Sequence, residues 1–268
     1  MSLLVKANRE GPDIVRVTPR TAGWRYVGFS AHRLRDEETV RIDQPDDELC
    51  VVVLGGSASI RGAGQAWSRI GKRRDVFDDM APYAVYLPSG DGVEVSAHGS
   101  AEIGVASASG RGSGAARLIE PSSMKRFSRG TGLNTRHICD ILPESEPASH
   151  LLVVEVRTPS GHSSSYPPHK HDADNLPQES ALEETYYHRL DPAQGFAFQR
   201  VYTDDRSLDE SFAVENHDVV MVPRGYHPVV VPYGYESYYL NVMAGPRREW
   251  HFRNDPAHEW ILSSGAFR

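Results

Sequence analysis

Two histidines separated by a single residue are the first feature of the sequence with the potential for chemistry. The stretch SYPPHKHD, residues 165–172, places His169 and His171 on either side of Lys170, after two prolines that keep the chain extended. Side chains alternate across an extended strand, so both imidazoles should face one way and Lys170 the other. Imidazole nitrogen binds first-row divalent metals. The pair therefore predicts half of a metal site, although two ordinary hydrogen-bonded histidines would have the same spacing.

Two residues further along the chain could complete this site. Glu184 comes directly before the strand-like run TYYHRL (185–190), and His227 follows a Pro-x-Gly turn in PRGYHPVVV. On neighbouring strands of a small barrel, these residues and the histidine pair would form a four-ligand site with coordination positions left open. Open positions are typical of catalytic rather than structural metal sites. A His₃Glu donor set suits one divalent ion, Zn, Mn, Fe or Ni, and does not select among them.

Short strand-like runs bounded by Gly, Pro, Asp and Asn must position these ligands, since long helical periodicity is nearly absent. Short helices are expected only around 123–129 and near the C-terminus. The Gly/Ser-rich stretch SGRGSGAA, which begins at residue 109, is typical of a flexible connection. We therefore predict an all-β protein with two halves, 1–115 and 116–268, each a β-sandwich or β-barrel. The expected strands are 24–34, 38–42, 48–54, 83–88, 92–97, 101–108, 136–142, 150–158, 185–190, 196–203, 218–223, 227–232 and 237–244.

Composition excludes several classes of protein. The chain has 268 residues, of which 39% are hydrophobic, so it can bury a substantial core. A formal net charge of −7 argues against a nucleic-acid partner, and no apolar run is long enough to span a membrane. Only two cysteines are present, and the N-terminus does not have the pattern of a signal peptide. These features predict a cytoplasmic protein.

The order of the candidate ligands resembles the two motifs of the cupin family, which implies a jelly-roll barrel. Two departures stand out: Glu184 lies thirteen residues after His171, further than is usual, and only Tyr226 separates the Pro-x-Gly turn from His227. The intervening segment is polar and contains a proline, so it should form a loop that still lets the ligands converge. The motif positions are His169, His171, Glu184, Gly195, Pro223, Gly225 and His227.

The first half contains the same frame without its histidines. Glu48 and Gly55 have the glutamate-to-glycine spacing of the first motif, and Pro88-Ser89-Gly90 resembles the turn of the second. No histidine precedes Glu48 at the required distance, and Val93 stands where the late histidine would fall. This pattern predicts a bicupin with a degenerate, metal-free N-terminal domain (1–115) and a metal-binding C-terminal domain (116–268).

A more specific resemblance covers residues 161–260. The segments SSYPPHKHD, LEETYYHRL, GFAFQRVYTDD, DVVMVPRGYHPV, GYESYYLNVMAGP and NDPAHEW are together similar to the 5-deoxy-glucuronate isomerase family of myo-inositol catabolism. The resemblance implies a metal-assisted aldose–ketose isomerase that converts 5-deoxy-D-glucuronate to 2-deoxy-5-keto-D-gluconate. A related isomerase of 5-keto-4-deoxyuronate is also similar, and it favours Glu184 over Glu183 as the ligand.

The implied substrate is a sugar acid, so a cation should meet its carboxylate. Arg200, on a predicted strand, could form a bidentate contact, with Lys170 and Arg224 as other candidates; an exposed or salt-bridged Arg200 is an equally good interpretation. Tyr186 and His188 share the strand parity of Glu184 and should face inward with it. Each is a candidate pocket wall, hydrogen-bond partner or proton carrier, Tyr186 is also expected to contact the substrate, and the catalytic base stays unassigned. A further pair with this spacing, Tyr239 and Asn241, is expected to line the same cavity as substrate contacts.

Two other functions remain open at this point. A metal-dependent cupin dioxygenase would use a similar ligand set, and a non-catalytic sugar-binding cupin would tolerate loss of the ligands. The retained histidines argue against the second, and the family-like segments outside the ligands argue against the first. Homo-oligomers are a further expectation, because edge strands of bicupins commonly pair.

Overall fold

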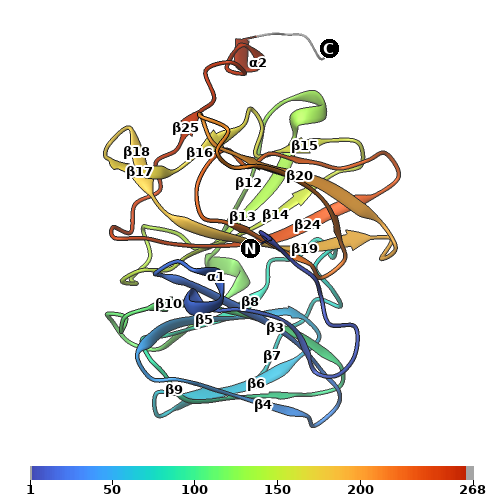
Figure 1. Ribbon diagram of the computed structural model, residues 1–268. Coiled ribbons are helices and arrows are strands. Elements are labelled where there is room, and N and C mark those ends of the chain that lie inside the picture. Colours follow the sequence, from blue (N-terminus) through green and yellow to red (C-terminus); the bar gives the residue numbers. More distant parts are fainter. Residues whose placement is uncertain (1, 264–268) are drawn as a thin grey trace.

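Two β-barrels stacked on one another form the protein, and helices are confined to a few short turns (Figure 1). The computed structural model describes residues 2–263. All the strands expected from the sequence are present, which confirms the all-β prediction. Within these described residues, the two α-helices are α1 (Pro19–Ala22) and α2 (Trp260–Ser263), and two single 3₁₀ turns are η1 (Pro121–Ser123) and η2 (Gly132–Asn134).

The first barrel is built from a large and a small sheet. Its strands are β2 (Asp13–Val17), β3 (Val27–Leu34), β4 (Thr39–Gln44), β5 (Asp47–Gly55), β6 (Ala58–Gly62), β7 (Gln65–Ile70), β8 (Tyr83–Leu87), β9 (Gly90–Ala97), β10 (Ala101–Ser109) and β11 (Arg117–Ile119). The large sheet has the order β11-β8-β5-β10-β3-β2, and the small one β4-β9-β6-β7. Apolar side chains from both sheets fill the space between them, among them Leu49, Val51 and Val93. The side chains of this core cluster are apolar and offer no metal ligand.

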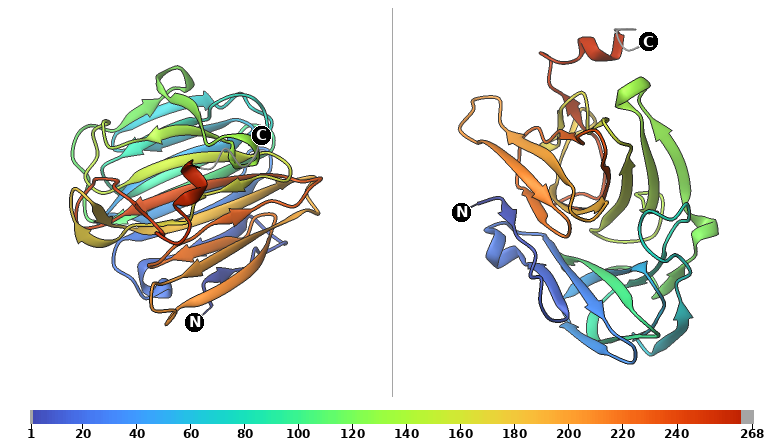
Figure 2. Two further views of the ribbon diagram at one scale, coloured as in Figure 1. Left: turned by 90° about the horizontal axis from the view of Figure 1, so that it is seen from above. Right: turned by 90° about the vertical axis from the view of Figure 1, so that its right-hand side faces the viewer.

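The second barrel has the same plan, seen in cross-section in Figure 2. Its strands are β1 (Leu4–Val5), β12 (Lys125–Arg129), β13 (Arg136–Leu142), β14 (Leu152–Thr158), β15 (Ser163–Ser164), β16 (His169–Lys170), β17 (Asp172–Asn175), β18 (Glu179–Ala181), β19 (Glu183–Asp191), β20 (Phe196–Tyr202), β21 (Asp209–Glu215), β22 (Val219–Val222), β23 (Val229–Val230), β24 (Glu236–Ala244) and β25 (Arg253–Asn254). The large sheet runs β1-β22-β19-β24-β14-β13-β12, and β15-β23-β20-β21 lies opposite. Unlike the first barrel, this one carries polar side chains on its inner face.

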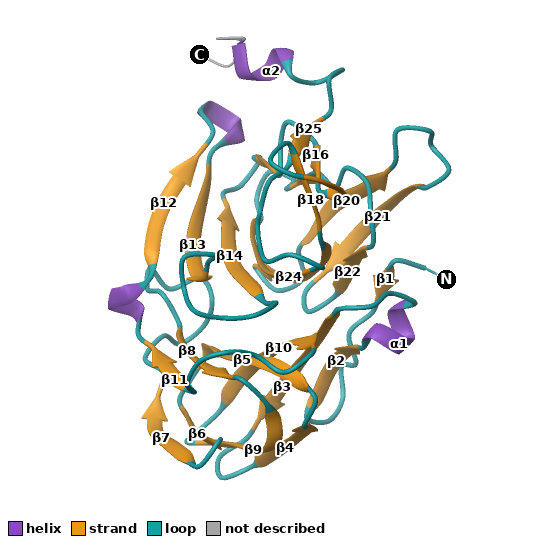
Figure 3. Cartoon of the chain, turned by 90° about the vertical axis from the view of Figure 1, so that its left-hand side faces the viewer, coloured by secondary structure: helices purple, strands orange, loops and turns teal. Residues whose placement is uncertain are grey.

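The two large sheets pack face to face and form the main core of the molecule (Figure 3). Because both faces of these sheets are buried, their central strands have continuous apolar runs in place of alternation. In β5, for example, Val51 faces the first barrel's interior, whereas Cys50 and Val52 face the second barrel. The second barrel contributes Tyr187, Tyr238 and Leu240 to the same layer.

Two glutamates tie the barrels together in a reciprocal way. Glu48, on β5, accepts backbone N–H groups of Ser149, His150 and Leu151 at 2.7–3.1 Å, just where the second barrel's β14 begins. Glu183, on β19, accepts backbone N–H groups of Arg25, Tyr26 and Val27 at 2.7–3.0 Å, where the first barrel's β3 begins. Each carboxylate thus binds three consecutive amides of the other barrel. The two residues occupy equivalent places in an internal duplication.

This equivalence corrects the expected role of Glu48 in the motif. Leu49 pairs with Leu87, directly before Pro88, as Glu184 pairs with Val222 directly before Pro223. The first-barrel counterpart of Glu184 is therefore Leu49, whose side chain lies in the apolar interior. Glu48 points the opposite way, into the interface between the barrels.

Three local expectations also change. Residues 125–129, expected to be helical, form strand β12, because they pair with β13 at the edge of the large sheet. The Gly/Ser-rich segment is packed against the first barrel: Gly112 donates to the carbonyl of Pro88 at 2.8 Å, and Tyr86 donates to that of Ser113 at 2.9 Å. The strands β1 and β11 each pair with the barrel on the other side of the predicted boundary. The division at 115/116 stays a proposal.

Candidate metal centre

Three histidines and a glutamate from different elements meet inside the second barrel. His169 lies on β16, held beside β25, and His171 follows it; Glu184 lies on β19, and His227 follows the turn after β22. The ligand nitrogens of the three histidines all lie within 4.8 Å of one another. One carboxylate oxygen of Glu184, Oε2, is 3.2 Å from His171 Nε2 and 3.3 Å from His227 Nε2. The structure therefore brings the three predicted histidines into one cluster and places Glu184 against two of them, and all four residues are buried.

Hydrogen bonds to the backbone orient two of the imidazoles. The Nδ1 atom of His171 is 3.2 Å from the carbonyl of Leu182, and Nδ1 of His227 is 2.9 Å from that of Gly225. A carbonyl accepts only, so each Nδ1 carries a proton and each Nε2 is turned toward the cluster, where it can bind a metal when it is unprotonated. Asn241 donates to Oε1 of Glu184 and leaves Oε2 facing the imidazoles.

This arrangement places electron pairs opposite one another and calls for a cation between them. The Nε2 atom of His227 is buried and has no hydrogen-bond donor, although the carboxylate of Glu184 lies close by. A divalent metal would satisfy the imidazole lone pairs and the carboxylate charge together, and neutral imidazole and carboxylate are the forms that bind metal. The residues present therefore fit the ion that the fold implies.

Burial controls the protonation of the cluster. Burial, with the neighbouring His227 and His171, holds the pKa of His169 well below its usual value. Burial likewise lowers the pKa of His227 to about 4. Burial also acts to lower the pKa of His171, but its hydrogen bond with Glu184 and the charge of that carboxylate outweigh this effect and raise it. A proton in the cluster is therefore favoured at His171 over His169 and His227, and a metal ion would displace it.

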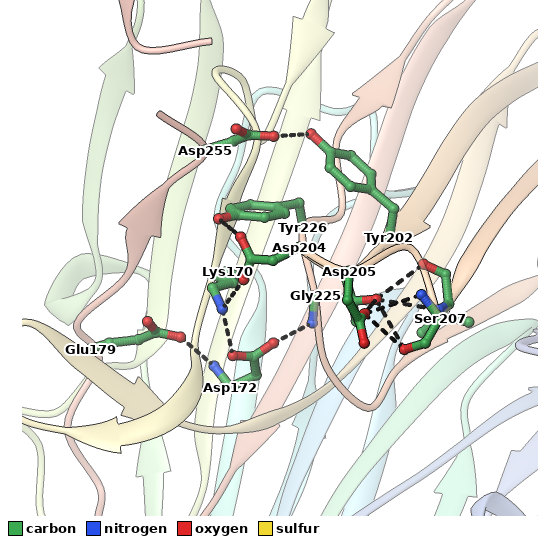
Figure 4. A network of polar contacts seen from close by, with 12 residues as sticks. Lys170, Asp172, Glu179, Tyr202, Asp204, Asp205, Ser207, Gly225, Tyr226 and Asp255 are labelled. Atoms are coloured by element: carbon green, nitrogen blue, oxygen red, sulfur yellow. Dashed lines mark hydrogen bonds and ion pairs between the residues drawn. The ribbon is translucent and has the colours of Figure 1, made fainter. Parts of the chain in front are cut away.

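A network of polar contacts behind the ligands fixes the strand that carries His169 and His171 (Figure 4). Lys170 points away from the cluster, as strand alternation predicts, and binds Asp172 at 3.1 Å and Asp204 at 2.8 Å. The other oxygen of Asp172 accepts the backbone N–H of Gly225 at 2.8 Å. A residue with a Cβ at Gly225 would meet the carbonyl of Tyr202 at 2.4 Å, so this turn requires glycine. Asp172 thus joins the His169–His171 strand to the turn that presents His227.

Replacing Asp172 by alanine should weaken metal binding without removing a ligand. The turn before His227 would lose its anchor, and the expected loss of metal affinity is about 10–100-fold, as for other groups that orient metal ligands. Competition with a coloured chelator measures this affinity. Asp209→Ala is the matched control, because Asp209 binds only the exposed Arg200 on the outer face. Equal affinities for the two variants would contradict the assigned role of Asp172.

The other predicted inward residues of β19 and β24 line the same interior. Tyr186 lies 5.6 Å from His227 between ring centroids, and its hydroxyl is 3.2 Å from that of Ser165. Tyr239 bonds Ser164, and Asn241 bonds Glu184. His188 lies deeper, with Nε2 at 2.8 Å from Oε1 of Gln199, and its Nδ1 is buried without a partner.

The predicted carboxylate contacts do not reach the cluster. Arg200 lies on the outer face of β20 and binds Asp209 through two bonds of 2.7 Å. Strand alternation turns Gln199 and Val201 inward and leaves Arg200 exposed. Arg224 is exposed as well, and Lys170 binds its two aspartates. Arg200 is thus exposed and paired with an acid, the alternative that the sequence left open, and it does not face the cluster.

Three residues at the cluster were missed by reasoning from the sequence. Ser164 and Ser165 precede the prolines of SYPPHKHD and bond the two inward tyrosines. Phe252 packs against His169 with ring centroids 4.6 Å apart. The two serines lie a few residues before the His169/His171 pair, and this position could have indicated their role. Phe252 comes from a distant segment, and no local pattern indicates its contact.

Comparisons with known proteins agree with this architecture. The model of the KduI/IolB family matches residues 3–261. A 5-deoxy-glucuronate isomerase of Geobacillus thermodenitrificans is 57% identical over 257 residues, covering 96% of this chain and 93% of the relative. The Bacillus subtilis protein of the same name is 48% identical, covering 92% and 91%. A crystal structure of an IolB-like protein from Salmonella typhimurium superposes with a TM-score of 0.95 at 47% identity, covering 98% of this chain and 100% of the other.

More distant structures identify the fold. The oxalate decarboxylase of Lactobacillus farciminis matches with a TM-score of 0.67 at 13% identity, covering 98% of this chain and 91% of the other. That enzyme has the cupin fold in both halves, so the predicted bicupin architecture is confirmed. Within residues 2–263, no helix has both the length and the apolar character needed to cross a membrane.

Proposed function

Since the chain belongs to the KduI/IolB family, we propose that it converts 5-deoxy-D-glucuronate to 2-deoxy-5-keto-D-gluconate, an aldose–ketose isomerisation of myo-inositol catabolism. One observation supports placing the reaction at this site: the Nε2 atoms of His171 and His227 both face the same carboxylate oxygen of Glu184. That geometry suits a divalent ion with room for a substrate. The first barrel, whose interior is apolar, would then serve as a support without a metal.

The metal would be held by His169, His171, Glu184 and His227, and we propose Zn, Mn, Fe or Ni as the ion. When bound, such an ion polarises the substrate carbonyl and stabilises negative charge on its oxygens. Asn241 keeps Glu184 directed at the cluster, and the carbonyls of Leu182 and Gly225 keep two imidazoles in the metal-binding tautomer.

The remaining inward residues divide into proton donors and a proton acceptor. Burial, with the charge of Glu184, raises the pKa of Tyr186 well above its usual value, so its hydroxyl stays protonated. Tyr186 can therefore donate a hydrogen bond to a substrate oxygen but cannot take a proton from carbon at neutral pH. Burial lowers the pKa of His188 to about 4, so its imidazole is neutral. Its Nδ1 lone pair is unpartnered, which makes His188 the candidate to move the proton between the two carbons.

Turnover in the absence of oxygen tests this function. The purified protein, loaded with each candidate ion, is incubated under argon with 5-deoxy-D-glucuronate, and the ketose is followed by NMR. We expect conversion without oxygen and its loss after chelation. A requirement for oxygen would favour a dioxygenase, and preference for 5-keto-4-deoxyuronate would assign the related isomerase reaction. Absence of turnover with every ion would refute the proposal.

A further inference from the structure

We propose that Arg136 binds the carboxylate of the sugar acid and so directs the opposite, carbonyl end of the substrate to the metal cluster. The inference rests on the proposed function and adds to it the residue that makes the site specific for an acid. It replaces Arg200, which faces outward.

Strand geometry places Arg136 on the inner face of the second barrel. Arg136 is the first residue of β13, two before Ile138, and side chains two apart share a face. Ile138 pairs with Val156, which pairs with Tyr239, and all three side chains belong to the barrel's interior cluster. Arg136 therefore lies at the end of the interior row next to Tyr239.

Arg136 is half-buried and, in the described part of the chain, has no acidic partner. Among residues 2–263, no carboxylate lies within ion-pair distance of it, whereas Arg73 is paired with Glu155 and Arg189 with Glu102. Arg248 also lacks an acidic partner in this part of the chain, but its Nε, Nη1 and Nη2 atoms are all taken up by backbone carbonyls. Within the same residues, Nη1 is the only nitrogen of the Arg136 side chain that donates hydrogen bonds. Its acceptors are uncharged: the carbonyls of Asn134 at 3.3 Å and Tyr166 at 3.4 Å, and Asn134 Oδ1 at 3.5 Å. Burial lowers the pKa of Arg136, as expected for a cation without a counterion. Its Nε and Nη2 atoms remain available for a bidentate carboxylate contact.

The same bonds locate Arg136 beside the metal cluster. Tyr166, whose carbonyl it contacts, lies three residues before His169 on the segment that enters the ligand strand. Asn134 also donates to that carbonyl at 2.8 Å and holds the two segments together. Arg136 is close enough for its charge to act on the pKa of His169. A cation at the Tyr166 end of this segment and the histidines at its other end would suit the two ends of a uronic acid.

The neighbouring cation is a poorer candidate. Arg129 pairs with Arg136 across β12 and β13, but it is exposed and lies over three aromatic rings. Its guanidinium is 5.4 Å from the ring centroid of Phe127 and 6.0 Å from those of Trp250 and Phe252. Deeper in the row of Arg136, the hydroxyls of Thr158 and Ser237 are buried without hydrogen-bond partners. These atoms add to the polar character of the barrel end that Arg136 occupies.

Substrate discrimination tests the assignment. Wild type, Arg136→Met, Arg136→Lys and the control Arg200→Met are compared on 5-deoxy-D-glucuronate and on its neutral analogue, in which a hydroxymethyl group replaces the carboxylate. We expect Arg136→Met to lower kcat/KM for the acid about 100-fold, mainly through KM, and to leave the neutral analogue unchanged. Lysine should restore part of the loss, and Arg200→Met should behave as wild type. An equal loss on both substrates, or no loss on the acid, would overturn the proposal.

Two measurements separate this proposal from the function on which it rests. Metal content should be unchanged in Arg136→Met, since no ligand is altered. Calorimetric titration with D-glucuronate, which needs no turnover, should show binding about 10-fold or more weaker in Arg136→Met than in Arg200→Met. If wild type fails to isomerise 5-deoxy-glucuronate but this difference in glucuronate binding is found, the proposed function is refuted and the contact between Arg136 and the carboxylate is supported. Equal binding of glucuronate by the two variants would refute the contact.

Discussion

Replacing His171 by alanine should abolish metal retention and lower turnover of 5-deoxy-glucuronate on the order of 1000-fold. His171 Nε2 lies 3.2 Å from Glu184 Oε2, so its removal takes away one donor and leaves the carboxylate opposite a gap. The three remaining ligands would hold an ion weakly, and the carbonyl of the substrate would lose its main source of polarisation. Metal analysis after gel filtration, together with the NMR assay, measures both effects.

A histidine outside the barrel interior provides the control for this result. His258→Ala should keep the metal content and turnover of wild type, because that side chain is partly exposed and lies 3.9 Å from Asp255, away from the cluster. Circular dichroism should show that both variants retain the β-sheet spectrum. Full metal content in His171→Ala would mean that the ion is bound elsewhere.

Glu48→Ala should be the most destabilising change at the junction between the barrels. The N–H groups of Ser149, His150 and Leu151, two half-buried and one buried, would lose their acceptor, and the hydroxyl of Tyr86 would keep only the carbonyl of Ser113. Each unsatisfied buried donor costs about 1–3 kcal/mol, and water will recover part of this, so we expect a loss on the order of 4 kcal/mol in the free energy of unfolding. Urea denaturation measures the change directly, and the melting temperature should fall by about 10 °C.

The exposed Glu10 offers a matched glutamate-to-alanine control, for which we expect less than about 0.5 kcal/mol. Glu183→Ala should also destabilise, since this residue makes the equivalent contacts in the opposite direction. If Glu48→Ala were as stable as Glu10→Ala, the reciprocal amide contacts would not hold the barrels together.

Strand parity explains both what the sequence predicts about the site and where such prediction fails. Alternation alone predicts that His169 and His171 face the same way, and that Glu184, Tyr186 and His188 share one face of their strand. The structure has both arrangements. Alternation does not say which face is inner, however. On β20, Phe198 is half exposed and lies on the same face as Arg200, whereas the smaller Ala197 and Val201 face inward, so the large aromatic residue indicates the wrong side.

The first barrel shows how small a shift is enough to mislead. Asp47-Glu48-Leu49 and Glu183-Glu184 both place an acidic residue before an apolar strand, and a shift of one residue turns a side chain to the other face. Only the pairing of Leu49 with Leu87 reveals that Leu49 is the counterpart of Glu184. The helix expected around 123–129 is absent for a related reason. Residues 125–129 pair with β13, and a local sequence pattern gives no information about such pairing between separate segments.

Anomalous diffraction from crystals of the metal-loaded protein tests the central claim most directly. We predict one strong peak inside the second barrel, bound by nitrogens of His169, His171 and His227 at about 2.0–2.2 Å and by a carboxylate oxygen of Glu184, with at least one open position, and no peak in the first barrel. A peak coordinated by other residues, or none in a protein that isomerises 5-deoxy-glucuronate, would contradict the account.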